Sequence, residues 1–324
     1  MKKITLSILF YLILLHALAQ QNTQYGQYVF NGLYINPAYA GHKDKIYLQA
    51  FVRTQWTGIQ GAPQSFSVSL DAPVPKTKIG LGTVLTKDKI GAQSSTNATA
   101  NISYYLNFSE EGSKILAFGF GIGVLQSSIN GGLLNPVETG DKSIPTGLES
   151  RNVADIRAGL QYSTEKFFIG FSANNLLPQY LILVNDDGIL SMKVKPHFYL
   201  TVAKVFQMNQ DIVLKPSILI KDDINGPTSL DLSTLLLIRN KIWIGGLYRT
   251  SAKLYPKNNL QHDLSNKSAV GFIVEFFAKP NLRLGYGYDH SLNKLRTYDN
   301  GSHELSVGFY LNNTKSQKKV ANYF

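Results

Sequence analysis

The sequence of 324 residues contains no cysteine, which excludes a disulfide framework, a zinc site built from thiolates and a lipid-modified N-terminal cysteine. Its mean hydropathy of −0.07 excludes a bundle of membrane helices but allows a membrane barrel, because residues that line a barrel are polar. Tryptophan is scarce, at 2 residues, whereas 18 tyrosines and 17 phenylalanines give a high aromatic content. Aromatic residues of this kind form the interfacial girdles of membrane barrels.

Acidic residues are also few, because 21 Asp and Glu stand against 32 Lys and Arg, for a formal net charge of +11. The lysines are spread through predicted turns and the tail rather than clustered on one helix or interleaved with aromatics, so nucleic acid is not an expected partner. An exported protein of this charge is expected to meet anionic outer-membrane lipid or an acidic partner.

The first residues have the features of a secretory signal peptide. Lys2 and Lys3 precede an apolar run at 4–15, and an A-x-A cleavage site ends at Ala19. The apolar run is too short to span a bilayer, which argues against a retained anchor helix. The sequence therefore predicts a signal peptide at 1–19, cleavage after Ala19, and export.

The stretch 282–311 shows an alternation that recurs along the chain. A period of two places one set of side chains on each face of a strand. The inward set is predicted to be small, polar or charged, and the outward set apolar with aromatics. The outward set comprises Leu282, Leu284, Tyr286, Tyr288, Leu305, Val307, Phe309 and Leu311. This pattern is typical of a membrane barrel, although one hairpin of a soluble sandwich would share it.

Fourteen segments can be read as strands, an even number as bacterial single-chain barrels require. Most are long enough to cross the hydrocarbon layer when tilted. They are 45–56, 64–73, 78–87, 95–108, 114–126, 152–163, 166–174, 196–207, 211–221, 228–239, 241–250, 268–278, 281–289 and 303–311. The predicted fold is all-β: a transmembrane antiparallel β-barrel over 45–311.

The predicted connections alternate in length. Long links are expected at 57–63, 88–94, 127–151, 175–195, 222–227, 251–267 and 290–302, and short turns at the other end. Tight periplasmic turns and longer external loops are the signature of an outer-membrane barrel. Within 175–195, the apolar run Leu181, Ile182, Leu183 and Val184 suggests a lid, a constriction or a partner surface, or else an extension of the neighbouring strand.

Two further segments flank the predicted barrel. Residues 20–44 are rich in Tyr, Asn and Gly and contain Pro37, so they form either a periplasmic or plug-like segment at the barrel mouth or an ordinary leader to the first strand. Residues 312–324 are predicted to be a periplasmic tail, which lysines keep solvated and which ends in the aromatic pair Tyr323 and Phe324.

The sequence shows no catalytic, cofactor-binding or metal site. No histidine stands at metal-ligand spacing with a carboxylate, and neither a nucleophile elbow nor a phosphate-binding glycine loop is present. His303 and Glu304 follow Ser302, but neighbours on a strand point to opposite faces. We expect neither enzymatic activity nor a cofactor.

Charges of both signs are predicted to face the lumen. We expect them to pair and so to fill or rigidify the lumen, with a polar path as the alternative. These lumen-facing candidates are Arg53, Asp71, Asp155, Arg157, Asp231, Arg249, Arg283 and Asp289.

Three motifs together resemble one family, over about 27–324. The first motif is Phe30-Asn31 followed by Asn36, Pro37, Ala38, Tyr39, Ala40 and Gly41. The second is Arg53 to Trp56 with 61–63. The third combines Tyr286, Tyr288 and Asp289 with His303 and Glu304. In this order they are similar to the PorP/SprF-like membrane proteins of the type IX secretion system. Gly32 stands where relatives often carry proline, and the tail lacks the Pro-Arg that often precedes the final Tyr-Phe.

The resemblance implies an outer-membrane barrel that binds the C-terminal domain of a secreted adhesin, together with other type IX secretion components, for secretion, surface anchoring or gliding motility. A second hypothesis is a FadL-like transporter of small hydrophobic compounds, and a third is an adhesin or a purely structural barrel. An apolar tunnel with a lateral opening would favour transport. Loops that occlude the lumen or fit a protein domain would favour anchoring.

Overall fold

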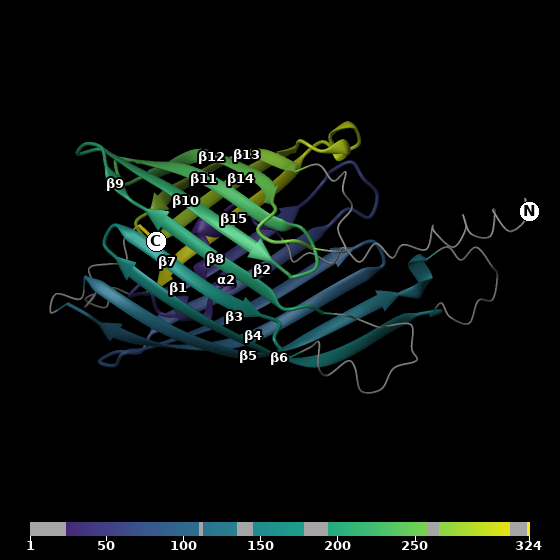
Figure 1. The fold of residues 1–324 in the computed structure, drawn as a ribbon, viewed down its shortest axis with the longest axis horizontal. Coiled ribbons are helices and arrows are strands. Elements are labelled where there is room, and N and C mark those ends of the chain that lie inside the picture. The colour runs from purple at the N-terminus through teal and green to yellow at the C-terminus, as the bar shows by residue number, and fades with distance from the viewer. Residues whose placement is uncertain (1–23, 110–112, 135–144, 178–193, 258–265, 312–322) are drawn as a thin grey trace, which may run out of the picture.

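The computed structural model describes residues 24–109, 113–134, 145–177, 194–257, 266–311 and 323–324, and these form a closed antiparallel barrel (Figure 1). The strands are β1 Ile46–Thr54, β2 Gln64–Pro73, β3 Ile79–Ile90, β4 Gln93–Asn107, β5 Lys114–Asn130, β6 Leu148–Thr164, β7 Phe167–Asn174, β8 His197–Lys204, β9 Phe206–Gln207, β10 Ile212–Asp222, β11 Thr228–Ile238, β12 Ile242–Ala252, β13 Lys267–Lys279, β14 Leu282–Ser291 and β15 Ser302–Leu311. Each strand pairs with its sequence neighbours, and β1 pairs with β15 to close the sheet.

The segments β8 and β9 are two halves of one strand. Ala203 pairs with Ser217 and Phe206 pairs with Leu214, so both halves keep a single register against β10. Between them, the amide of Val205 donates to Lys166 O at 2.8 Å, which keeps the strand attached to its other neighbour. The barrel therefore has fourteen strands, and the predicted fold class and strand number are confirmed.

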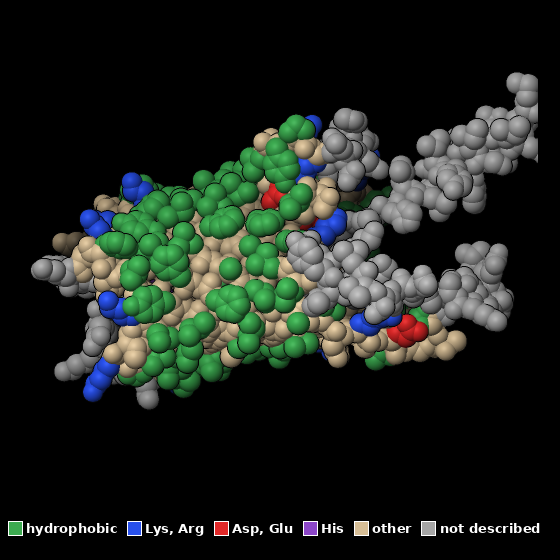
Figure 2. All heavy atoms as spheres, turned by 60° about the horizontal axis from the view of Figure 1, so that its bottom comes forward, with side chains coloured by type: hydrophobic (Ala, Val, Ile, Leu, Met, Phe, Trp, Pro, Cys, Tyr) green, Lys and Arg blue, Asp and Glu red, His purple; other side chains and the backbone are tan. Residues whose placement is uncertain are grey.

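The alternation of the sequence determines the two faces of the wall. On β5, Phe118 and Ile122 are 48% and 58% exposed, whereas Ala117 between apolar neighbours is fully buried. The outer surface is an apolar belt, with lysines and arginines at its ends (Figure 2). Exposed lysines mark the short turns at one end: Lys76, Lys114, Lys166, Lys241 and Lys279. Such a belt matches the hydrocarbon layer of a membrane, and the lysines lie where lipid headgroups begin. No helix in the described residues is long and apolar enough to cross a membrane.

The two ends of the barrel differ. The connections 74–78, 165–166, 208–211, 239–241 and 280–281 form the short-turn end, which lies at the left of Figure 1. At Arg239 and Asn240, φ values of 49° and 54° build a tight turn of the mirror-image kind that suits the twist of a hairpin. The opposite, long-loop end faces the exterior in barrels of this class.

One predicted long link is wrong. The sequence suggested a connection over 88–94, but β3 and β4 continue to Ile90 and from Gln93, and Gly91 at φ 56° turns the chain between them. Strands β5 and β6 likewise run on to Asn130 and from Leu148, beyond the predicted ends at 126 and 152. Most residues of these extensions are polar or charged, with serine the commonest, as expected for strand ends that project past the apolar belt.

The segment before β1 lies inside the barrel. It folds into three short helices, η1 Tyr28–Phe30, α2 Gly32–Ile35 and η2 Pro37–Tyr39, although the sequence offered no convincing helix. Nearly all its described side chains are buried, and Ala38 and Ala40 have no exposed surface. We call residues 24–44 the plug segment. Two short helices, η3 Gly131–Leu133 and η5 Lys294–Thr297, lie at the long-loop end.

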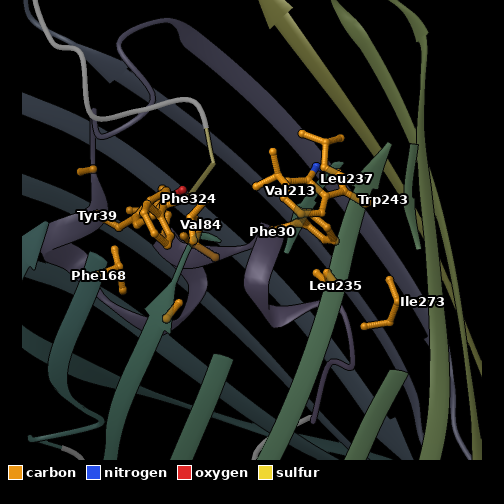
Figure 3. Packing of buried hydrophobic residues seen from close by; sticks show 14 residues of the cluster. Phe30, Tyr39, Val84, Phe168, Val213, Leu235, Leu237, Trp243, Ile273 and Phe324 are labelled. Carbon is orange, nitrogen blue, oxygen red and sulfur yellow. The ribbon is translucent and has the colours of Figure 1, made fainter. Parts of the chain in front are cut away.

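The apolar core of the protein is the contact between the plug segment and the wall. Phe30 meets Trp243 of β12 with ring centroids 6.1 Å apart, and Tyr39 meets Phe168 of β7 at 6.3 Å (Figure 3). Phe324 enters this cluster from the other end of the sequence and stacks on Phe168 at 5.5 Å. The lumen is thus filled from within by residues at both ends of the described chain.

Candidate functional site

The predicted inward charges converge in one ion-pair network. Arg53 of β1 lies 2.6 Å from Asp289 of β14 and 3.1 Å from Glu304 of β15. Arg249 of β12 contacts both carboxylate oxygens of Asp231, at 3.0 and 3.1 Å, and approaches Asp289 at 3.5 Å. All five side chains are at most 6% exposed. The network joins five strands, β11, β12, β14, β15 and β1, and so crosses the seam where β1 pairs with β15. Such charges are stabilised by one another rather than by water.

Further pairs involve residues that the sequence interpretation did not select. Arg283 forms an ion pair with Glu275 of β13, and Lys221 contacts Asp231 at 2.8 Å. Glu275 could have been found from its phase, because it shares a strand face with Gly271 and Ile273, four and two residues earlier. A charged residue and a glycine on one face of an otherwise apolar strand indicate that this face lines the lumen.

The seam also holds the start of the plug segment. Glu304 accepts hydrogen bonds from the amides of Gly26 and Gln27, at 2.8 and 3.0 Å. The Gln27 side chain in turn accepts from the hydroxyl of Ser306 at 2.7 Å. One carboxylate therefore binds the wall through Arg53 and the plug through two amides, which satisfies its buried oxygens.

Two other predicted lumen charges, Asp71 and Arg157, bind the backbone of the plug segment. Asp71 accepts from the amide of Gly41, and Arg157 donates to the carbonyls of Leu33 and Tyr34 at 2.9 and 3.1 Å. These bonds supply partners to backbone groups that irregular structure would otherwise leave buried and unpaired. Asp155 differs, since its Oδ2 accepts from the side-chain amide of Asn97 on the wall, at 3.4 Å.

The motif at Asn36 to Gly41 is the tightest contact between plug and wall. The Asn36 side chain accepts from the amide of Ala38 and donates to the carbonyl of Leu160, at 2.9 and 3.0 Å. A Cβ added to Gly119 of β5 would lie 2.0 Å from the Ala38 nitrogen, and one on Gly159 of β6 would lie 2.0 Å from Asn36 Oδ1. Glycines in the wall thus allow the plug backbone to approach directly.

The rest of this motif is equally enclosed. Tyr39 packs over Gly32, where a Cβ would come within 2.3 Å of the ring, so glycine is required at the position where relatives often carry proline. Gly41 adopts a φ of 66°, which favours glycine, and lies beside Gly80 of β3.

The short-turn mouth contains two buried lysines. Lys215 donates to Tyr323 O at 2.6 Å, and its ammonium lies 5.1 to 5.5 Å from the ring centres of Phe30, Trp243 and Phe324. Lys43 donates to Phe324 O at 3.4 Å. Burial and the nearby charge of Arg283 lower the pKa of Lys43 to about 7, although Glu275 and Asp71 act in the opposite direction.

The closing-hairpin motif is divided between the two faces. Glu304 points into the lumen, whereas His303 lies on the outer face, where its Nδ1 is 2.8 Å from the Tyr286 hydroxyl and its ring is 5.2 Å from that of Tyr288. The pair therefore does not form a catalytic arrangement. Trp56 follows β1 with a φ of 52°, and its amide donates to Ser302 Oγ at 3.2 Å.

A cavity of about 540 Å³ lies above the plug segment, towards the long-loop end. We call it the vestibule. Most of the residues that line it are polar or charged, and they include Gln24, Asp155, Arg157 and His197, with Trp56 among the apolar ones. In the described part of the chain, no three His, Cys, Asp or Glu residues are grouped to hold a metal ion. The predicted partner loop, Leu181 to Val184, lies outside the described residues.

Comparison with protein families gives one match. Residues 17–309 match the model for the type IX secretion system membrane protein PorP/SprF, from before the plug segment to β15. The chain belongs to the PorP/SprF family. The predicted resemblance is confirmed, and family and barrel together place the protein in the outer membrane. A search among curated proteins found no match.

Solved structures similar to this PorP/SprF protein are outer-membrane barrels. They include Omp33 of Acinetobacter baumannii, at 8% identity, a TM-score of 0.44, and coverage of 84% of this chain and 100% of that one. A FadL homologue of Pseudomonas aeruginosa is similar at 12% identity and a TM-score of 0.43, with coverage of 87% and 93%.

Proposed function

We propose that this PorP/SprF protein binds the C-terminal domain of a secreted adhesin at the outer membrane, for secretion or surface anchoring. The observation that carries the proposal is the filled lumen. Apolar contacts, ion pairs and hydrogen bonds to the wall hold the plug segment in place over much of the barrel's length. A barrel filled in this way is suited to bind a partner at its mouth rather than to pass a solute through its centre.

The vestibule supports the same proposal. It lies at the long-loop end, among residues such as Trp56, Lys89 and Asn293 at or beyond the strand ends, which is the end that a partner outside the cell would meet. Most of the residues that line it are polar or charged, whereas sites for hydrophobic ligands are lined predominantly by hydrophobic and aromatic residues. The FadL-like alternative requires an apolar tunnel, and the vestibule is instead lined by Asp155, Arg157, His197 and many amide and hydroxyl groups.

The experiment is an affinity pull-down of the tagged barrel from detergent-solubilised outer membranes, followed by mass spectrometry. We expect to recover a large secreted protein through its C-terminal domain. Replacing Leu181, Ile182, Leu183 and Val184 with serine should reduce this recovery, while Met208→Ser, at an exposed apolar side chain of the short-turn end, should not. Heat-modifiable migration on gels checks that each barrel is folded.

The same preparation tests the alternative function. Native mass spectrometry of the purified barrel would detect a stoichiometric fatty acid. A folded barrel that carries such a ligand and recovers no secreted protein would contradict the adhesin-binding proposal and favour transport. A barrel purified with a secreted protein and without lipid ligand would support the proposal.

A further inference from the structure

Strand β6 is much longer than the strand that follows it. It has 17 residues, as β5 has, whereas β7 has 8. Strand β5 pairs with β6 along its whole length, but β7 pairs with it only over 158–163. The part of β6 before Ile156 therefore projects beyond β7 at the long-loop end, past the apolar belt. All of 148–152 is exposed, and Leu148 is 70% exposed.

The end of β7 has a local cause. The amide of Leu176 donates to Ile156 O at 3.0 Å, the hydrogen bond nearest the long-loop end between these two segments of the described chain. One residue earlier, Asn175 adopts a φ of 57°, which interrupts the extended backbone. Asn174 donates its side-chain amide to Ile35 O at 3.1 Å. The end of β7 is thus bound to the plug segment, inside the barrel.

The hydrogen bond at Ile156 also shows which backbone groups of β6 point to the uncovered side. The N–H and C=O of one residue point to the same side of a strand, and this side alternates along the strand. Since the carbonyl of Ile156 points away from β5, the backbone groups of Ser150, Asn152 and Ala154 do so as well. Within the described residues, no strand pairs with these three on that side. The open edge, over 148–154, is roughly 23 Å long at about 3.3 Å per residue.

The opposite side of the same extension is covered. Strands β3 and β4 also run past the apolar belt, and Lys89 of β3 pairs with Gln64 at the start of β2. Beyond it, the amide of Gly91 donates to Gly61 O at 2.8 Å. The extended parts of β3 to β6 therefore form a sheet with one covered edge and one open edge. An open edge is a template for a further strand, which natural proteins usually shield.

We propose that this edge of β6 binds an extended segment of the secreted partner as an additional β-strand. This inference rests on the proposed function, since it names how the partner is bound. The backbone groups of Ser150, Asn152 and Ala154 form the ladder, so the partner supplies an exposed strand of about five residues rather than one particular side chain. Alternate side chains of that strand point towards the vestibule, which β6 also lines through Asp155.

A second copy of the barrel does not fit this edge. Strands of membrane barrels are tilted by about 35–45°, and two copies side by side in one membrane have the same orientation. Where their β6 strands face each other, the two tilts are opposite, so the strands cross at about 70–90°. Crossed strands cannot form a ladder, whereas a partner outside the membrane can align its strand with β6.

Proline at one position separates main-chain from side-chain recognition. Asn152→Pro removes an N–H that points to the open edge, so the barrel should still fold, because proline is tolerated at sheet edges. The probe is the secreted protein isolated in the pull-down, and biolayer interferometry measures its affinity for the purified barrel. Asn152→Pro should weaken this affinity about tenfold, since the ring replaces a ladder donor and intrudes on the partner strand. Asn152→Ala keeps the N–H and should lose at most about twofold.

Hydrogen exchange, followed by fragment-resolved mass spectrometry, examines the same edge without a mutation. In the free barrel, the amides of Ser150, Asn152 and Ala154 should exchange faster than that of Val153, which faces β5. The bound secreted protein should slow all three. Slow exchange in the free barrel would show that another segment of the chain already covers this edge, and would overturn the inference.

The outcomes separate the inference from the proposed function. Equal loss of affinity in both Asn152 variants would indicate recognition of the side chain, and full affinity in both would place the contact elsewhere. Either result overturns the inference while the proposed function stands. If heat-modifiable migration shows that the proline variant does not fold, exchange decides: protection of 148–154 in the complex supports the inference, and its absence overturns it. If the unaltered barrel recovers no secreted protein, the proposed function fails, and the inference fails with it.

Discussion

Arg53 and Glu304 are cross-strand partners at the seam where β1 meets β15, with a nitrogen-to-oxygen distance of 3.1 Å inside the barrel. Glu304 also binds the plug amides of Gly26 and Gln27, and Arg53 reaches Asp289 on the next strand. This contact therefore connects barrel closure with lumen filling, and it is the natural first target for mutation.

Glu304→Ala should lower the free energy of unfolding by about 3 kcal/mol, because removing one member of a buried pair leaves Arg53 and two amides without their acceptor. Urea unfolding in detergent, followed by tryptophan fluorescence, measures the change. Asp211→Asn is the control, since the Asp211 side chain is 63% exposed and lies 3.9 Å from Arg239. Exposed pairs of this kind contribute little. Equal midpoints for both variants would contradict the role assigned to the seam.

Gly119→Ala should displace the plug segment, because the new methyl group would lie 2.0 Å from the Ala38 nitrogen. We expect a lower unfolding temperature and a larger ion conductance in planar bilayers than for the unaltered protein. Gly246→Ala provides the comparison, as its nearest contact would be Gly271 O at 3.7 Å. A conductance that stays at the level of the unaltered protein in Gly119→Ala would show that the wall accommodates the methyl group.

Phe324→Ala should destabilise the protein by about 3 kcal/mol, since a buried ring that stacks on Phe168 is replaced by a cavity. Differential scanning calorimetry of the detergent-solubilised barrel measures the change. The matched variant is Tyr298→Ala, because Tyr298 is 74% exposed and its loss should have little effect. If the two variants melt together, Phe324 does not stabilise the short-turn mouth.

The lowered pKa of Lys43 should make the stability of the protein depend on pH. Its pKa is lowered from 10.5 to about 7 in the folded protein, so between pH 7 and 10.5 the unfolded chain binds more protons at this site. The free energy of unfolding should therefore rise with pH across that window through this group. Lys43→Met should remove this contribution, and unfolding curves at pH 7 and pH 9.5 for both proteins measure the difference. A parallel pH dependence in both would contradict the assignment.

Much of the wall could be predicted because its physics is local. On β4, Ile102 and Tyr104 face lipid while Asn101 and Ser103 face the lumen, as a period of two requires. Whether a residue of the wall faces lipid or the lumen follows from its polarity alone. Strand ends were harder to predict: the polar residues beyond the apolar belt look like loop, and only pairing with neighbouring strands shows that β3 and β4 continue.

The path of the plug segment could not be read from its sequence. Asn36 and Ala38 lie against Gly159 of β6 and Gly119 of β5, and Gly41 lies against Gly80 of β3, all on strands distant in the sequence. Local rules describe Pro37 as a break but do not say what lies on either side of it. The vestibule was missed for the same reason, since Asp155, Asn174 and His197 belong to different strands and come together only when β6, β7 and β8 pair.

The plug segment also has a consequence for assembly. Gln27, near the start of the described chain, bonds to Ser306 on the last strand, whereas Asn36 bonds to Leu160 in the middle of the sequence. The interior cannot acquire its full set of partners until β15 has been made and has joined β1. Pairing of β1 with β15 and packing of the interior are therefore one cooperative late step. An assembly factor that keeps β1 and β15 apart would also keep the lumen unfilled.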